Sequence, residues 1–171
     1  MLKKPIDAIV RELSKKLPHR PAPNDDRTDY STSFLAPVVV IFVKVREKIL
    51  ALHRSQEIYA YPDKWSVNAG FLDKDWPIEC AILEELTDEL GLKEEYLRGL
   101  ITKIKIRDYY KYTDKKSGKE WLRVPVLVEL REEPAITLNF EHTKYLWVDK
   151  ERLLELDTPP GFAGDLERAL G

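Results

Sequence analysis

Hydrophobic residues follow two different spacings along this chain, and the change of spacing separates predicted strands from predicted helices. Residues 37–43 read PVVVIFV, a continuous β-branched run that predicts a strand buried on both faces. A turn at residues 46–48 leads to a second predicted strand at 49–54. The alternating segments 100–112 and 120–130, joined by turn residues 114–118, predict a hairpin. A last strand is predicted at 144–148.

Helical spacing appears near both ends of the chain. Residues 5–17 place apolar side chains at helical intervals and predict an amphipathic helix. Pro18, Pro21 and Pro23 should end that helix and begin an extended linker. Two further helices are predicted near the C-terminus, at residues 149–156 and 165–170.

A longer helix is predicted in the middle of the chain. It should begin near Asp75 to Pro77, because aspartate can cap a helix and proline suits its first turn, and it should end at Gly91. One face of this helix is apolar and must pack against the rest of the molecule; its residues are Ile78, Ile82, Leu83, Leu86 and Leu90.

The other face of the central helix carries Glu84, Glu85, Asp88 and Glu89. Like charges three or four residues apart on a helix cost a few tenths of a kcal/mol per pair. Asp88 and Glu89 also lie in the last turn, where the helix dipole disfavours an anion by about 0.3–1 kcal/mol. A hard cation such as Mg²⁺ or Mn²⁺ would relieve this repulsion and could join the carboxylates to substrate phosphates. A solvated acidic face is the alternative.

Residues 70–92, GFLDKDWPIECAILEELTDELGL, resemble the Nudix box, G-x5-E-x7-R-E-U-x-E-E-x-G-U. Six box positions agree, namely Gly70, Glu85, Leu86, Glu89, Gly91 and Leu92, and Asp88 is a conservative change. Trp76 and Glu84 replace the first Glu and the Arg, two residues that often form an ion pair in the family. The order and spacing of the segments around the box are similar to the family from about residue 35 to residue 157.

The resemblance implies an α/β fold, a Nudix-type α/β/α sandwich with a mixed sheet. Residues 1–34 would form an N-terminal extension, a helix followed by a Pro-rich linker, and residues 35–171 the Nudix hydrolase-like domain. The implied reaction is attack of water on a phosphorus of a nucleoside diphosphate derivative, with Mg²⁺ or Mn²⁺ as cofactor. Gly70, Glu85, Asp88 and Glu89 are the implied metal ligands, and Glu85 or Glu141 is the implied general base.

Three residues are candidates for substrate binding. The resemblance places Arg54 on the substrate side, where its planar guanidinium could hold a phosphate; a surface ion pair is the alternative. Arg107 and Tyr109 belong to a cationic stripe on the predicted hairpin that could meet a phosphorylated ligand, with the aromatic ring stacking on a base. The alternative there is a solvated sheet face whose lysines block edge pairing.

Two other functions are compatible with the same fold. Because Trp76 and Glu84 break the box, the chain could be a silent Nudix-fold module that binds a nucleotide. Isopentenyl diphosphate isomerase shares the fold, but its chemistry needs an active-site cysteine and a His-rich metal site. Cys80 is expected on or beside the buried helix face, and the three histidines show no paired ligand spacing.

Composition narrows the class of protein. The 171 residues suffice for one domain, and the net charge of −2 with 43% hydrophobic and 34% charged residues gives no reason to expect binding to nucleic acid or membrane. One cysteine excludes an internal disulfide and favours a cytoplasmic location. The basic N-terminal helix is expected to dock on its own domain or across a homodimer interface.

Overall fold

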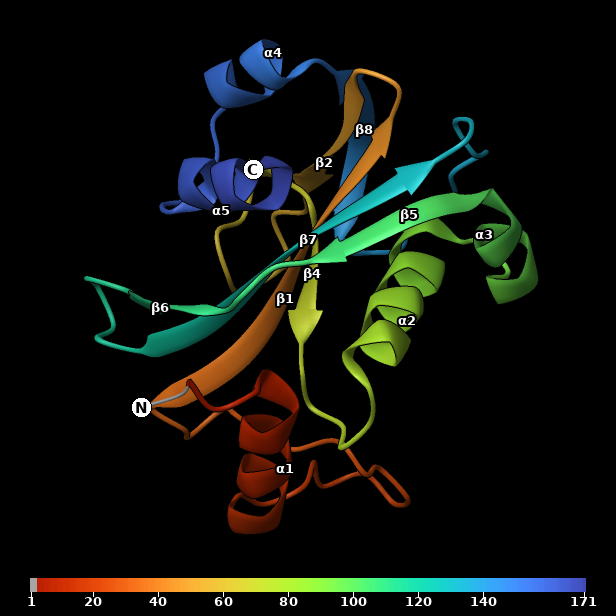
Figure 1. The fold of residues 1–171 in the computed structure, drawn as a ribbon. Coiled ribbons are helices and arrows are strands. Elements are labelled where there is room, and N and C mark those ends of the chain that lie inside the picture. The colour runs from red at the N-terminus through yellow and green to blue at the C-terminus, as the bar shows by residue number, and fades with distance from the viewer. Residues whose placement is uncertain (1–2) are drawn as a thin grey trace.

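A computed structural model describes residues 3–171 of the chain (Figure 1). In this part, a mixed sheet of eight strands forms the centre of the molecule. The strands are β1 (Leu35–Val45), β2 (Lys48–Arg54), β3 (Trp65–Ser66), β4 (Asn68–Phe71), β5 (Ile101–Ile106), β6 (Tyr110–Thr113), β7 (Glu120–Leu130) and β8 (His142–Val148). The helices are α1 (Ile6–Lys16), α2 (Ile78–Leu90), α3 (Glu94–Leu100), α4 (Lys150–Glu155) and α5 (Phe162–Leu170).

Strand β1 is the central strand, as its continuous apolar sequence predicts. It pairs in parallel with β7 and antiparallel with β4 and β2, and β2 pairs in turn with β8. Its successive side chains enter two separate hydrophobic cores: Ile41 packs in one and Phe42 in the other, and both are fully buried. A strand covered on both faces needs apolar residues at every position, which explains the absence of alternation.

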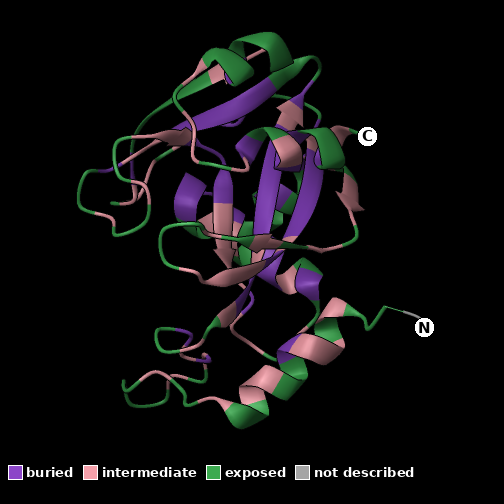
Figure 2. Ribbon diagram, turned by 90° about the vertical axis from the view of Figure 1, so that its left-hand side faces the viewer, coloured by how far each residue is buried: buried purple, intermediate pink, exposed green. Residues whose placement is uncertain are grey.

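Helices cover both faces of the sheet. Helix α2 packs on one face, where Ile82, Leu86 and Leu90 join the larger core, and α5 covers the other face with Phe162 and Leu166 (Figures 1 and 2). The predicted α/β sandwich with a mixed sheet and an N-terminal helix is therefore confirmed. No helix within residues 3–171 is both long and apolar enough to cross a membrane.

The predicted hairpin is wrong in detail, because its first arm is not one strand. Leu100 belongs to the unpredicted helix α3, and the arm divides into β5 and β6 at residues 107–109. The carbonyl of Pro125 on β7 accepts a hydrogen bond from the Arg107 amide, so it faces this arm. Because the N–H and C=O of one residue point to the same side of a strand, an ordinary residue at position 125 would also donate its N–H to this arm. Proline has no N–H, so the ladder between β7 and the arm loses one hydrogen bond there. The turn at Asp114–Gly118 is confirmed, with Gly118 at a φ of 71°.

The start of the central helix also differs from the prediction. Helix α2 begins at Ile78, and Pro77 is the N-cap with φ −57° and ψ 142°, an extended conformation. Asp75 does not cap the helix; its carboxylate instead forms an ion pair with Arg11 at 3.3 Å. Proline fixes φ but supplies no side-chain acceptor, so the helix starts one residue later without a side-chain cap.

Candidate functional site

Helix α2 ends where the sequence predicts, and its end places two glutamates against strand β4. Gly91 adopts φ 63°, a left-handed conformation that glycine accepts without steric cost, and its N–H closes the helix on the Thr87 carbonyl. Glu85 and Glu89 are one helical turn apart and therefore lie on the same side of α2. Both face the sheet edge formed by Asn68–Phe71, because α2 packs on β4.

Gly70 permits a very close approach between β4 and α2. A Cβ atom built on Gly70 would lie 2.0 Å from Oε1 of Glu85, so any side chain at this position would collide with that carboxylate. Gly70 has an ordinary negative φ, and the requirement for glycine is therefore one of space. The Glu85 carboxylate consequently lies directly over the backbone of the β4 strand.

Glu89 is a buried carboxylate with one occupied and one free oxygen. Only 1% of the residue is exposed, and its Oε2 accepts a hydrogen bond of 2.9 Å from Nδ2 of Asn68. Nδ1 of His142 lies 3.8 Å from the same Oε2. Glu89 Oε1 and both ring nitrogens of His142 are buried without a hydrogen-bond partner among the described residues. Buried polar atoms in folded proteins are nearly always paired, with a protein group, an ordered water or a ligand.

Burial dominates the electrostatics of the site around Glu85, Glu89 and His142, which we call the glutamate cluster. Loss of solvent is the main cause of the rise in the pKa of Glu85 to about 8; a side-chain hydrogen bond with Glu89 opposes this rise, and the nearby Glu141 carboxylate adds to it. The pKa of Glu89 is raised by burial and then by the charge of Glu85. Burial likewise lowers the pKa of the His142 imidazole to about 4, with Arg54 acting in the same direction, so His142 is neutral at physiological pH. Without a counter-charge, the acidic groups of the cluster therefore tend to keep their protons.

A divalent cation fits the chemistry of Glu85 and Glu89. Both carboxylates would ionise fully beside a positive charge, and the unpaired Oε1 of Glu89 is an oxygen donor of the kind that Mg²⁺ and Mn²⁺ prefer. Within residues 3–171, however, no three His, Cys, Asp or Glu side chains converge as a ready metal site. Asp88 is exposed, and its carboxylate contacts Nδ2 of Asn139 at 3.4 Å. Its assignment as a metal ligand remains a prediction, as do those of Gly70, Glu85 and Glu89.

Arg54 and Glu141 lie beside the same cluster. Arg54, at the end of β2, pairs in register with His142 on β8, and the amide of Ser55 donates to the Glu141 carbonyl at 2.8 Å. Burial raises the pKa of Glu141, and the positive charge of Arg54 opposes that rise. Nε of Arg54 donates to the Ala60 carbonyl at 2.9 Å and thereby fixes the plane of the guanidinium.

Arg107 and Tyr109 contact other parts of the molecule. Nε of Arg107 donates to the Ala169 carbonyl of α5 at 3.4 Å. The Tyr109 hydroxyl donates to the Lys4 carbonyl at 2.9 Å, and the Lys3 ammonium lies 3.9 Å from its ring centre. The structure does not bring these two residues into contact with the glutamate cluster, and their substrate role remains a prediction.

Two residues of the site were missed by the sequence reasoning. Asn68 is a polar residue in a short strand two positions before Gly70, and His142 follows Glu141 directly. The sequence offered one signal for them, their position: Asn68 lies close to the Nudix box, and His142 is adjacent to Glu141. A single polar residue inside a strand does not reveal its partner, which here comes from a helix distant in sequence.

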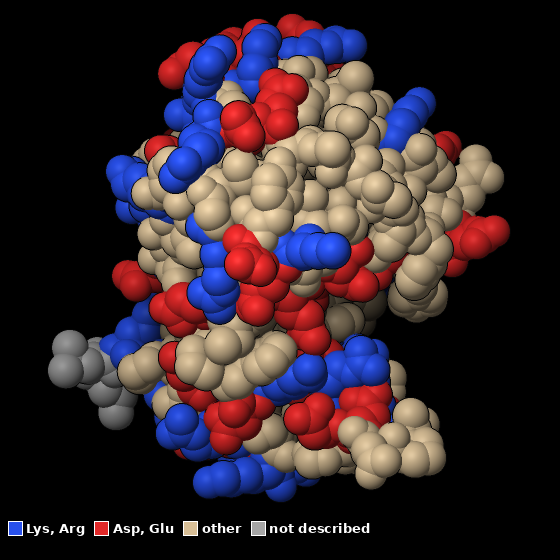
Figure 3. Space-filling view, turned by 90° about the vertical axis from the view of Figure 1, so that its right-hand side faces the viewer, with Lys and Arg blue, Asp and Glu red and all other residues tan. Residues whose placement is uncertain are grey.

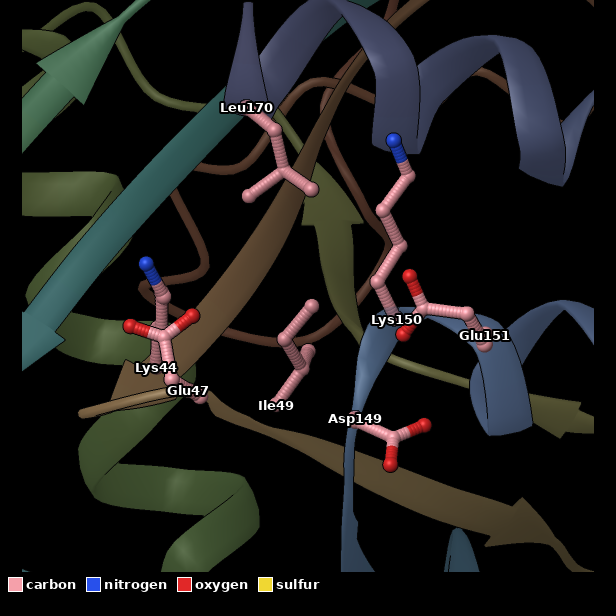
Figure 4. Close-up of a pocket in the computed structure, with 7 residues that line it drawn as sticks. All are labelled: Lys44, Glu47, Ile49, Asp149, Lys150, Glu151 and Leu170. Carbon is pink, nitrogen blue, oxygen red and sulfur yellow. The ribbon is translucent and has the colours of Figure 1, made fainter.

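A surface hollow elsewhere carries none of the predicted site residues (Figure 4). It has a volume of about 240 Å³ and lies where the β1–β2 turn meets α4 and α5. Charges of both signs line it, among them Lys44, Glu47 and Lys150, and Asp149 at its edge lies 3.9 Å from the Lys48 ammonium. We assign it no role in the chemistry of the glutamate cluster.

We expect Asn68→Leu to weaken binding of Mn²⁺ by roughly 10–100-fold, the usual effect of removing the hydrogen-bond partner of a metal ligand. The change keeps the branched shape and the number of side-chain heavy atoms but removes the donor to Glu89 Oε2, which frees the carboxylate to rotate. Calorimetric titration with Mn²⁺ measures the effect, and Thr102→Val, which removes an exposed side-chain donor to the Glu129 carbonyl, is the comparison. Equal Mn²⁺ affinity in the two variants would contradict a role of Asn68 in orienting Glu89.

The sequence profile of the NUDIX domain matches residues 34–166. Among solved structures, a MutT protein from Methanosarcina mazei Go1 is similar at 19% identity and a TM-score of 0.61, covering 78% of this chain and 91% of that one. A C. elegans Ap4A hydrolase in a binary complex is 20% identical with a TM-score of 0.55, over 78% of this chain and 93% of that one.

A bifunctional NMN adenylyltransferase/ADP ribose pyrophosphatase from Francisella tularensis, complexed with AMP and a Mn ion, is 19% identical with a TM-score of 0.60. It covers 95% of this chain, which spans 44% of that protein. No curated protein sequence is significantly similar. At these identities the solved structures establish the fold, and the profile match over most of the chain establishes that it belongs to the Nudix family of pyrophosphate-bond hydrolases.

Proposed function

We propose that this protein hydrolyses the pyrophosphate bond of a nucleoside diphosphate derivative, with Mg²⁺ or Mn²⁺ as cofactor. The observation that carries the proposal is the pair of desolvated carboxylates Glu85 and Glu89, of which Glu85 lies directly against Gly70. Such a pair is costly without a counter-charge, and a cation shared with a substrate pyrophosphate supplies one. Two similar structures are those of an ADP ribose pyrophosphatase and an Ap4A hydrolase, which supports a nucleotide substrate.

In this proposal the side chains have separate roles. When bound, the cation neutralises pyrophosphate charge and lowers the pKa of water. Glu89 and Glu85 would hold the cation, and Asn68 orients the Glu89 carboxylate through its hydrogen bond to Oε2. Arg54 binds a phosphate oxygen through the guanidinium nitrogens that remain beside its Nε bond to Ala60. Glu141 takes the proton from the attacking water, because burial raises its pKa toward the range of an effective general base. Glu85 is the second candidate for that base.

A direct assay tests the proposal and separates it from the two alternatives. The full chain, with Mn²⁺, with Mg²⁺ or with EDTA, is offered ADP-ribose, a dinucleoside polyphosphate, a nucleotide sugar, a nucleoside triphosphate and isopentenyl diphosphate. Hydrolysis in ¹⁸O-water, followed by mass spectrometry, identifies the phosphorus that water attacks. Metal-dependent release of ¹⁸O-labelled phosphate product supports the hydrolase. Nucleotide binding without turnover would support the silent module.

The isomerase alternative has less support from the site. Cys80 is a partly buried free thiol in the first turn of α2, outside the hydrophobic cores. Within residues 3–171, His53 contacts Thr143 and Asp63, and His142 is the histidine that adjoins Glu89. A double-bond shift in isopentenyl diphosphate, scored by proton NMR in the same assay, would nevertheless overturn the hydrolase proposal.

Arg54→Ala is expected to raise KM for the active substrate by about 10–100-fold, with a smaller change in kcat, because a charge-assisted bond to phosphate contributes about 1.5–3 kcal/mol. Arg54→Lys should recover part of that loss, since it restores the charge but not the planar fork. Steady-state kinetics at saturating Mn²⁺ measure both constants. An unchanged KM in Arg54→Ala would exclude this residue from substrate binding.

A further inference from the structure

The N-terminal extension, residues 3–34 of the described chain, lies against the segment that leads from Gly70 into α2. We call that segment, residues 72–77, the box loop. Two successive residues of the box loop are held by the extension. The Tyr30 hydroxyl donates to the Leu72 carbonyl at 2.7 Å, and the Thr28 amide donates to the Asp73 carbonyl at 2.7 Å. Arg20 forms an ion pair with the Asp73 carboxylate at 3.2 Å.

These contacts are buried enough to fix the backbone of the box loop. Tyr30 is 4% exposed and Thr28 is 1% exposed. The side chain of Asp73 is 12% exposed and that of Arg20 is 38% exposed, so their ion pair is shielded from solvent on the Asp73 side. A fourth contact, between Arg11 and Asp75, is exposed and adds little. Val10 of α1 joins the hydrophobic core on the α2 side of the sheet, which anchors the extension as a whole.

The box loop is connected in turn to the helix turn that bears Glu85. The Lys74 ammonium lies 3.1 Å from Oε1 of Glu84 and 4.3 Å from the centre of the Trp76 ring. Its side chain is only 22% exposed, so one cation joins the start of the loop, its aromatic residue and the neighbour of Glu85. Figure 3 shows acidic and basic side chains interleaved where the N-terminal part of the molecule meets the rest.

From this chain of contacts we infer that the N-terminal extension is a positioning element of the metal site, which fixes the box loop and thereby the distance between Gly70 and Glu85. Arg20 and Tyr30 of the extension contact the box loop. Lys74 of the box loop connects it to helix α2 through its ion pair with Glu84. The inference rests on the proposed function, since it assigns these residues to the binding of its cation. It also gives a role to a segment that lies outside the matched NUDIX domain, residues 34–166.

The test uses the full chain and a matched pair of double variants. Arg20→Ala/Tyr30→Phe removes one cation and one tyrosine hydroxyl that touch the box loop. The control, Lys16→Ala/Tyr96→Phe, likewise removes one cation and one tyrosine hydroxyl, but from exposed positions on α1 and α3. Lys74→Met is a separate variant that keeps an aliphatic chain over Trp76 but loses the ion pair with Glu84. Mn²⁺ affinity is measured by calorimetry well below the unfolding temperature, and hydrogen exchange of residues 71–80 is measured by mass spectrometry without metal.

We expect about tenfold weaker Mn²⁺ binding in Arg20→Ala/Tyr30→Phe and in Lys74→Met, the low end of the loss on removing an outer partner of a metal ligand. Exchange of residues 71–80 should be faster in both, and the control should match the wild type. Arg20→Lys alone should retain most of the affinity. Wild-type Mn²⁺ affinity in both test variants would overturn the inference, even if exchange of residues 71–80 became faster. The extension would then stabilise the box loop without affecting the metal site.

Two further outcomes are distinguishable. If Arg20→Ala/Tyr30→Phe does not fold, Lys74→Met decides the inference, because it leaves the extension intact. If the wild-type chain binds no Mn²⁺, the proposed function fails. Exchange of residues 71–80 then decides whether the extension fixes the box loop, and unchanged exchange in the test variants would overturn that too.

Discussion

Glu89→Gln is expected to lower kcat/KM by on the order of 10³-fold, because the lost charge removes a cation interaction that contributes several kcal/mol at the transition state. The substitution is nearly isosteric, and the glutamine carbonyl can still accept the 2.9 Å hydrogen bond from Asn68. We expect Mn²⁺ binding to weaken in parallel. Initial rates at several Mn²⁺ concentrations separate weaker metal binding from slower turnover.

The same variant should not lose stability in the absence of metal. Glu89 is 1% exposed and close to a second carboxylate, so a neutral side chain relieves both desolvation and repulsion. Asp88→Asn is the informative comparison, since it neutralises an exposed acid of the same helix turn. If the activity of Glu89→Gln stayed within a few fold of wild type, the metal site would have to be elsewhere.

The second large effect is a loss of stability of the metal-free protein as pH rises from about 6.5 to about 8. Glu85 in the folded protein has its pKa raised to about 8, against 4.5 for the ordinary group. Between these values the folded state retains a proton that the unfolded state has released. Stability therefore falls as pH rises through this interval. Each unit of pKa difference is 1.36 kcal/mol, so the fall is on the order of a few kcal/mol.

His142 acts in the opposite direction at lower pH. Its pKa is lowered to about 4 in the folded state from 6.5, so between these values only the unfolded state binds the proton, and stability rises with pH. The two effects partly cancel below pH 6.5, and the net fall is concentrated above it. Glu89, whose pKa is also raised, adds to the fall.

Urea unfolding in EDTA at a series of pH values measures this dependence. Glu85→Gln should flatten the curve between pH 6.5 and 8, whereas Glu84→Gln, at the exposed neighbour, should not. Saturating Mn²⁺ should also reduce the fall, because a bound cation favours the ionised carboxylates. A metal-free wild type of constant stability over this range would mean that Glu85 is not desolvated as described.

Much of the fold could be predicted because its signals are local. The continuous apolar run of β1, the helical spacing of α1 and α2, and Gly91 at the end of α2 each depend on a few neighbouring residues. The predictions that failed concern segments whose conformation depends on residues far away in the sequence. The arm that divides into β5 and β6 does so because it faces Pro125 on another strand, and α3 replaced the start of a predicted strand.

The amino-acid sequence by itself determined that four acidic side chains gather on one helix near a glycine, since helical periodicity fixes their neighbours. Only the tertiary structure decided which of these side chains are buried and which stay exposed. Packing of α2 on β4 buries Glu89 and presses Glu85 onto Gly70, while Asp88 stays exposed. It also brings Asn68 and His142 to Glu89, and Arg20 to Asp73. Burial and hydrogen-bond partners depend on contacts between segments far apart in the chain, which no local pattern encodes.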